Sequence, residues 1–172
     1  VLKGIQKRLG GRLKFAISGG APLSPSLASE LHMLGIPVLE GYGLTETSGP
    51  VAINDLSDPS FGSVGKPLAG CEFRILSDGE ITIKTKEPFM GYWKNTDATN
   101  DILREGWLHT GDLGYLDERG RLHITDRKKD LLILSSGRNI APQKIEARVT
   151  STRYLEDLVV LGDRQDYLAA LI

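Results

Sequence analysis

The sequence has a single cysteine, Cys71, so it cannot form an internal disulfide. It also lacks any apolar run of the length needed for a signal or membrane-spanning segment. We interpret these two absences as indicating a reducing, cytoplasmic setting. An excess of one charge is missing too, because 21 basic and 22 acidic residues leave a formal net charge of -1. This balance predicts no nucleic-acid partner and no strongly acidic membrane partner.

What remains is typical of a globular chain, with 40% hydrophobic and 25% charged positions over 172 residues. The chain opens on Val1 and closes on the apolar run LAALI, and from these ends we expect a piece of a longer protein. The three histidines lack the spacing of metal ligands. We therefore look for function in the motifs.

The first third predicts a βαβ unit. LKFAI, residues 13–17, alternates as a strand does, and IPVLE, residues 36–40, is a second short apolar run. Between them Ser24 has the position of a helix N-cap, with Pro25 as the first helical residue and Gly35 closing the helix. A right-handed crossover makes the two strands parallel.

Two loops follow the carboxyl ends of these strands. SGGAP occupies residues 18–22, and EGYGLTET occupies residues 40–47. Because parallel strands point the same way, we expect both loops at one edge of the sheet, where open α/β sheets bind ligands. Turn chemistry explains the glycines and threonines but leaves Tyr42 and Glu46 unexplained.

The middle of the chain predicts antiparallel hairpins. Residues 71–75 and 81–83 alternate on either side of a Ser-Asp-Gly turn, and residues 113–116 face 122–125 across DERG. The fold class expected is α/β plus β-rich: a βαβ unit, about 10–50, followed by an antiparallel β subdomain, about 60–126.

A small α+β domain is expected to start after the charged run RKKD. Its elements are LLIL, a short helix begun at Pro142, and strands at 158–161 and 167–172. We therefore divide the chain into 1–128 and 129–172. In that division Lys129 is the hinge, while Lys128 is interpreted as a surface residue.

Five segments in order carry a resemblance over nearly the whole chain from Gly10 onward. They are SGGAPL, EGYGLTET, GEITIKTKEPFMGYW, GWLHTGDLG and ITDRKKDLLILSSGRNIAP. Their order and spacing resemble the adenylate-forming (AMP-binding) superfamily, and DRKKDLLI with GRNIAPQKIE is most similar to its long-chain fatty acid CoA ligases. The resemblance implies that a carboxylate attacks the α-phosphate of ATP and that the acyl-adenylate, acyl-AMP, is passed to coenzyme A.

The resemblance also implies roles for residues of the two loops. Glu46 resembles the ligand of Mg²⁺, a cation that takes carboxylate oxygens, and Thr45 offers its hydroxyl to the phosphate. Tyr42 would lie along the adenine, and Gly43 would border the acyl group. The backbone of Gly20, Ala21 and Pro22 would meet the adenine from the neighbouring loop, because small residues permit close approach.

Further roles fall in the second half of the chain. Asp112 in TGD matches the carboxylate that accepts the ribose hydroxyls, and Arg127 matches the guanidinium that reaches ribose and phosphate. Lys129 would turn the small domain between the two half-reactions, and Gly137 would line the coenzyme A channel. Taken alone, TGD is an ordinary turn and DRKKD an ordinary solvated charge run.

The expected partners are thus small molecules: fatty acid, ATP and coenzyme A. Peripheral membrane contact stays open, as do acyl chain length and oligomeric state. The alternatives are an adenylation domain of a peptide synthetase, another carboxylate ligase, or a non-catalytic nucleotide-binding module. The family's phosphate loop and C-terminal lysine are absent from these 172 residues, so we expect no turnover by this chain alone. This sequence departs from the family pattern at two positions: Thr85 stands where many members have glycine, and Ile133 stands where some have lysine.

Overall fold

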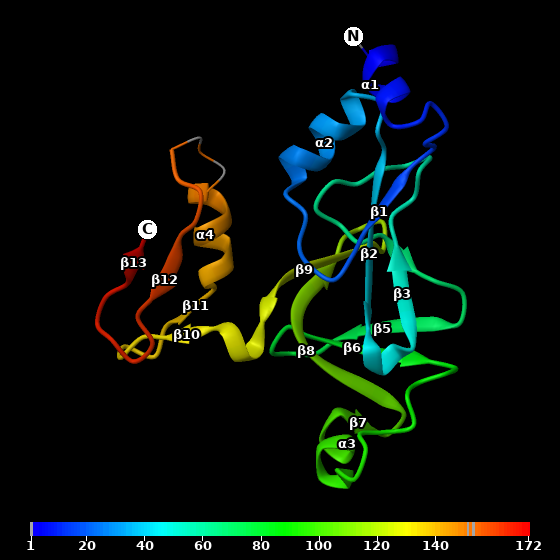
Figure 1. Cartoon of the computed structure of the whole chain (residues 1–172). Helices are drawn as coiled ribbons and strands as arrows, with labels where there is room; N and C mark the ends of the chain where they lie inside the picture. The colour runs from blue at the N-terminus through cyan, green and yellow to red at the C-terminus, as the bar shows by residue number, and fades with distance from the viewer. Residues whose placement is uncertain (1, 151, 153) are drawn as a thin grey trace.

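The computed structural model describes residues 2–150, 152 and 154–172, which form two packed parts joined by one connection (Figure 1). The first and larger part contains two sheets. The second part, yellow to red in Figure 1, lies beside it and is reached through a single strand and turn.

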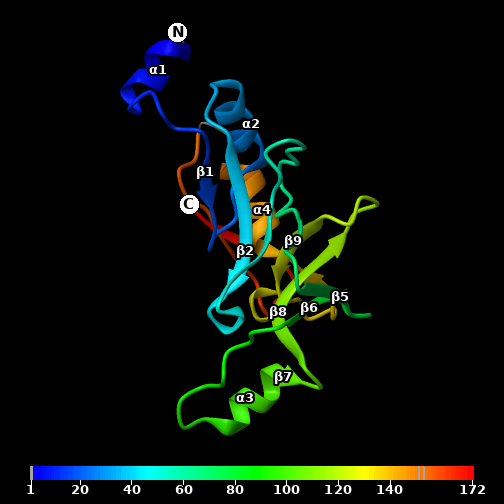
Figure 2. The same ribbon diagram turned by 90° about the vertical axis from the view of Figure 1, so that its right-hand side faces the viewer.

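The first sheet has four strands in the order β1-β2-β3-β4. These are β1 Ala16–Ser18, β2 Val38–Leu44, β3 Gly49–Ile53 and β4 Lys66–Pro67. β1 and β2 are parallel, with Ser18 beside Glu40, and α2 Pro25–Met33 connects them. The predicted βαβ unit is therefore present. Helix α1, Leu2–Arg8, precedes it at the N-terminal end (Figure 2).

Local capping explains where α2 begins and ends. The Ser24 hydroxyl accepts a hydrogen bond from the Leu27 amide, and Pro25 begins the helix, as predicted. Leu34 ends it, and Gly35 follows with φ +74°. That left-handed conformation is the usual reason for glycine after a helix.

Two features of this unit differ from the sequence prediction. The strand expected at 13–17 begins only at Ala16, and Leu13, Phe15 and Ile17 are 47%, 41% and 62% exposed. The strand expected at 36–40 instead continues to Leu44, because β3 returns beside it and supplies hydrogen-bond partners for Gly41 to Leu44. GYGL is therefore a strand rather than a loop.

The second sheet is antiparallel and has five strands. The order is β5-β6-β8-β7 with β9 also paired to β8, and the strands are β5 Cys71–Ile75, β6 Glu80–Thr85, β7 Leu103–Arg104, β8 Trp107–Leu116 and β9 Leu122–Arg127. Both predicted hairpins are present, each longer than predicted. Helix α3, Thr96–Ile102, and β7 project from the far end of this sheet (Figure 2).

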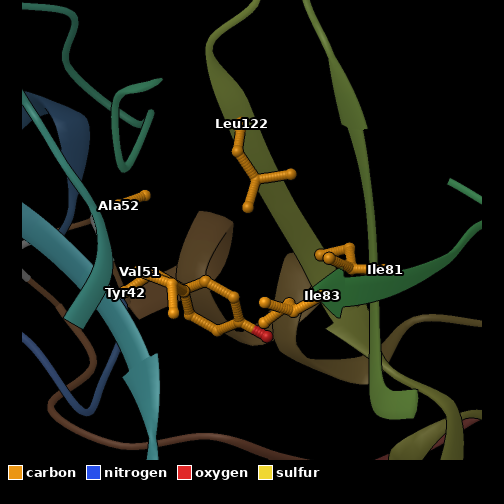
Figure 3. Close-up of a cluster of buried hydrophobic side chains, with 6 residues drawn as sticks. All are labelled: Tyr42, Val51, Ala52, Ile81, Ile83 and Leu122. Carbon is orange, nitrogen blue, oxygen red and sulfur yellow. The ribbon is translucent and has the colours of Figure 1, made fainter. Parts of the chain in front are cut away.

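The hydrophobic core fills the space between the two sheets. Figure 3 shows its buried members, which come from β2, β3, β6 and β9: Tyr42, Val51, Ala52, Ile81, Ile83 and Leu122. Cys71 packs against this cluster from its edge and is half-buried. The core thus fixes how the βαβ unit sits on the antiparallel sheet.

The second part consists of a helix and two short hairpins. Helix α4, Pro142–Thr150, begins at Pro142 as predicted. β10 Leu132–Ile133 pairs with β11 Asn139–Ile140, and β12 Val159–Leu161 pairs with β13 Ala169–Leu171. The turn η2, Lys128–Asp130, joins this part to β9.

Candidate nucleotide site

Three of the residues singled out in the sequence form one hydrogen-bonded network. The Tyr42 hydroxyl donates to Oδ2 of Asp112 at 2.6 Å, and Nε of Arg127 donates to Oδ1 of the same carboxylate at 2.8 Å. Asp112 and Arg127 are opposite each other on β8 and β9, whereas Tyr42 reaches across from β2. Residues from both sheets therefore meet at the Asp112 carboxylate.

Burial sets the electrostatics of this network. Asp112 is 2% exposed and Tyr42 is 8% exposed, while the Arg127 side chain is 47% exposed. Burial, followed by the negative charge of Asp112, raises the pKa of Tyr42 well above its ordinary value. The phenol therefore remains a neutral donor, and Arg127 is the solvent-facing member that covers the carboxylate.

The ring of Tyr42 points into the core, where Figure 3 shows it beside Val51 and Ile83. Little of this ring is open to a ligand in this structure. What the geometry shows directly is that Tyr42 holds the Asp112 carboxylate in place.

The SGGAP loop lies against the second strand, at the edge predicted from the parallel pairing. A Cβ on Gly19 would come 3.2 Å from the Gly41 carbonyl oxygen, so the two backbones nearly touch. Gly20, with φ +85°, Ala21 and Pro22 are all exposed beyond this contact. The loop therefore presents exposed backbone next to β2.

Gly43 has a structural reason to be glycine. A Cβ there would come 2.4 Å from the Gly49 carbonyl oxygen, at the point where the pairing of β2 and β3 shifts register. Any side chain would push the two strands apart. This packing requirement is independent of any contact with an acyl group.

Thr45 and Glu46 belong to η1, the single 3-10 turn Thr45–Thr47 that follows β2. Thr45 is exposed. The half-buried Glu46 accepts a hydrogen bond at Oε1 from the Tyr92 hydroxyl at 2.5 Å. This bond, followed by burial, raises the pKa of Tyr92 to about 12. Thr47 stabilises the turn, because its hydroxyl bonds the backbone of Leu44.

A second polar cluster lies beside Asp112, and sequence reasoning missed it. Glu80 accepts from the Gly111 amide at 3.0 Å and from the Lys128 ammonium at 2.7 Å, and its carboxylate lies 3.3 Å from Nδ1 of His109. Burial alone would raise the pKa of Glu80, but these hydrogen bonds outweigh it and hold that pKa below its ordinary value.

Lys128 lies at the surface, as interpreted, with its side chain 37% exposed, but it also forms ion pairs that the sequence did not predict. Its ammonium also contacts Asp78 at 2.6 Å, so it bridges two carboxylates of the β5–β6 hairpin. The sequence does show the two acidic residues, Asp78 and Glu80 in SDGE, that could pair with a lysine. Only the fold brings them next to Lys128 in η2. Trp93, in the segment that follows β6, is 87% exposed.

Two remaining candidates, Lys129 and Gly137, are exposed and come after the last member of the Asp112 network in the chain. Lys129 is exposed in η2, directly after Lys128. Gly137, with φ +80°, is exposed in the turn between β10 and β11, and Figure 1 shows that hairpin beside α4, apart from β2. The structure therefore does not bring Gly137 to the network.

The described residues hold no group of three or more His, Cys, Asp or Glu side chains arranged to bind a metal ion. No helix within residues 2–150, 152 and 154–172 is long and apolar enough to cross a membrane. Two shallow cavities, of about 380 and 230 Å³, are lined by other residues than Tyr42, Asp112 and Arg127.

Known proteins resemble this chain over most or all of its length. It is 42% identical over 172 residues to the long-chain-fatty-acid–CoA ligase FadD15 of Mycobacterium bovis, covering 100% of this chain and 29% of that protein. It is 41% identical over 161 residues to a 2-succinylbenzoate–CoA ligase of Bacillus mycoides, covering 87% of this chain and 33% of that protein. The chain thus spans about a third of the length of these relatives.

Solved structures agree with this likeness. The O-succinylbenzoate coenzyme A synthetase MenE from Bacillus subtilis, in complex with ATP and magnesium ion, superposes with a TM-score of 0.80. It is 31% identical, over 98% of this chain and 39% of that chain. Residues 2–93 match the family model described as AMP-binding enzyme, and residues 129–172 match the one described as AMP-binding enzyme C-terminal domain. The chain therefore belongs to the AMP-binding enzyme family, whose relatives are acyl-CoA ligases.

Proposed function

We propose that this chain is a segment of an AMP-forming long-chain fatty acid CoA ligase. The full-length protein would activate a fatty acid as acyl-AMP and transfer the acyl group to coenzyme A in the cytoplasm. The observation that carries the proposal is the network around Asp112. It joins Tyr42 and Arg127, 85 positions apart in sequence, at one buried carboxylate.

Asp112 has the chemistry needed to hold a ribose. Each carboxylate oxygen has two lone pairs, so Oδ1 and Oδ2 can each accept a further hydrogen bond besides those from Arg127 and Tyr42. Because the carboxylate is 2% exposed and Arg127 covers it, a ribose must displace the guanidinium sideways to reach it. The displaced guanidinium would then lie next to the ribose and phosphate.

The two loops at the end of β1 and β2 would hold the rest of the nucleotide. The exposed backbone of Gly20, Ala21 and Pro22 offers the adenine a surface without bulky side chains. Thr45, exposed at the start of η1, would donate its hydroxyl to the α-phosphate. Binding the reacting carboxylate and the phosphate together lowers the entropic part of the barrier.

Glu46 fits a single ligand of Mg²⁺. Within the described residues its carboxylate forms no ion pair and accepts one side-chain hydrogen bond, so lone pairs remain for a cation. Magnesium often takes one or two protein carboxylates together with substrate phosphates, so a three-residue cluster is not needed. When bound, the ion would neutralise phosphate charge during attack on the α-phosphate.

The division at Lys129 belongs to the same proposal. Lys128 is tied to the larger part through Asp78 and Glu80, whereas Lys129 is exposed and begins the region matched by the C-terminal family model. We infer that Lys129 is the pivot between the two half-reactions. Gly137 would reach the coenzyme A channel only after that rotation.

The acyl group is the part of the proposal that relatives leave open, since a 2-succinylbenzoate–CoA ligase is 41% identical over 87% of this chain and FadD15 is 42% identical over all of it. Thermal shift of the full-length protein would compare three ligands: ATP, a non-hydrolysable hexadecanoyl-adenylate analogue and the succinylbenzoyl analogue. The proposal expects the largest shift from the hexadecanoyl compound. A larger shift from the succinylbenzoyl compound would favour the aromatic ligases, and no shift from any ligand would favour a module without nucleotide binding.

A further inference from the structure

The segment 86–94, between β6 and α3, is fastened to η1 at Glu46. The Phe89 amide donates to the Glu46 carbonyl oxygen at 2.9 Å, and the Tyr92 hydroxyl donates to Oε1 of the Glu46 side chain at 2.5 Å. One residue of η1 is thus held by its backbone and by its carboxylate. The two donors are 43 and 46 positions further along the chain.

The segment is built to present the Tyr92 hydroxyl. The Tyr92 amide donates to the Thr99 hydroxyl at 2.9 Å, and its ring meets the Phe89 ring edge-on at 5.0 Å between centroids. Gly91 has φ +131°, and a Cβ there would come 2.9 Å from the Thr99 side chain. These contacts hold the Tyr92 backbone and set its ring against Phe89, while Tyr92 itself is 39% exposed and Met90 and Trp93 of the same segment are more exposed still.

Glu46 needs such a partner more than most carboxylates do. It sits in a single 3-10 turn and has a flexible side chain, so the turn alone does not determine where its oxygens point. A hydrogen bond from a fixed, neutral phenol orients the carboxylate without cancelling its charge. It occupies one lone pair of Oε1 and leaves Oε2 for a cation.

We propose that Tyr92 is a positioning residue that aims the Glu46 carboxylate at the metal ion of the bound nucleotide. The inference rests on the proposed function, because it takes Glu46 as the Mg²⁺ ligand. Hydrogen bonds from outside the ligand set orient metal-binding side chains, and their loss commonly weakens metal affinity about 10- to 100-fold. Tyr92 itself makes no contact with substrate in this role.

The test measures metal affinity directly in the full-length protein. Mn²⁺, a paramagnetic substitute for Mg²⁺, is titrated in the presence of a non-hydrolysable ATP analogue and followed by electron paramagnetic resonance. Tyr92→Phe removes the hydroxyl and keeps the ring against Phe89, and Glu46→Gln removes the ligand charge. Tyr167→Phe is the matched control, because Tyr167 is 72% exposed in the second part of the chain.

Tyr92→Phe is expected to weaken Mn²⁺ binding about 10- to 100-fold and to leave metal-free nucleotide binding unchanged. Its adenylation rate should recover at saturating Mg²⁺. In the Glu46→Gln background Tyr92→Phe should have no further effect on metal affinity. Tyr167→Phe should match the wild-type protein throughout.

Two results would overturn the assignment in different ways. If Tyr92→Phe keeps wild-type metal affinity while Glu46→Gln loses metal affinity, the Tyr92–Glu46 hydrogen bond serves only to hold the segment 86–94 in place. A lower melting temperature and a lower rate at every metal concentration would point the same way. Wild-type metal affinity in Glu46→Gln would remove both the proposed metal ligand and the role of Tyr92.

Discussion

Asp112→Ala tests the network that carries the proposed function. The change removes the acceptor of the Tyr42 hydroxyl, which is buried with its ring and 8% exposed overall. A buried donor left without a partner costs about 1–3 kcal/mol, and a hydrogen bond to a charged group contributes about 1.5–3 kcal/mol. This geometry predicts a loss of stability as well as of nucleotide affinity.

The Arg127 side of the network should contribute little to that loss. Removing one member of a buried ion pair can cost about 3–5 kcal/mol when the remaining charge stays buried. Arg127 is 47% exposed, so its guanidinium can turn into water, and a pair of this kind contributes about 0–1 kcal/mol. We therefore expect Asp112→Ala to lower the free energy of unfolding by about 1.5–3 kcal/mol, mainly through Tyr42.

Denaturant titration of the 172-residue chain measures this free energy, and a thermal scan should show a fall of about 3–12 °C in melting temperature. Tyr42→Phe provides the second arm of a double-mutant cycle. Because both changes break the same hydrogen bond, the double variant should lose less than the sum of the single losses, by about 0.5–3 kcal/mol. Additive losses, or unaltered stability in Asp112→Ala, would show that the bond does not stabilise the fold.

Three further predictions follow from the same contacts. Glu40→Gln should stabilise the chain at pH 7, because burial raises the pKa of Glu40 more than the Gly62 amide and His123 lower it. The penalty on the charged carboxylate disappears as pH falls through that raised pKa, so denaturant titrations should show the gain in stability at pH 7 and not at pH 4. In the full-length protein Lys129→Pro should slow thioester formation far more than adenylation, while Lys129→Ala changes little; equal losses in separately measured half-reactions would place the pivot elsewhere. The 172-residue chain alone should form no acyl-CoA above background in a coupled assay, because suppliers of phosphate stabilisation are missing, and turnover would refute this.

Local patterns predicted the elements well because their causes are local. The Ser24 cap, Pro25 and Gly35 mark the ends of α2 in the sequence and in the structure alike. Alternation likewise predicted both hairpins of the antiparallel sheet. Strand length was less predictable, since β2 continues to Leu44 only because β3 returns beside it.

The sequence proposed the candidate residues of the site but not the hydrogen bonds between them. The resemblance pointed to Tyr42, Asp112 and Arg127 separately, each facing a nucleotide. Their mutual hydrogen bonds depend on how the two sheets pack around the core, which no local pattern encodes. Tyr92 was missed for the same reason, because its partner Glu46 lies 46 positions earlier in the chain.

Lys128 and Lys129 show how far neighbouring residues in one charge run can diverge. A 3-10 turn places successive side chains about 120° apart, so only one of the two lysines can face the β5–β6 hairpin. Lys128 faces it and is held by Asp78 and Glu80, while Lys129 is exposed. A rotation of the second part about Lys129 can therefore leave these ion pairs intact, because Lys128 lies on the larger side of the pivot. A rotation that began before Lys128 would carry its side chain away from Asp78 and Glu80, and this difference favours the proposed pivot at Lys129.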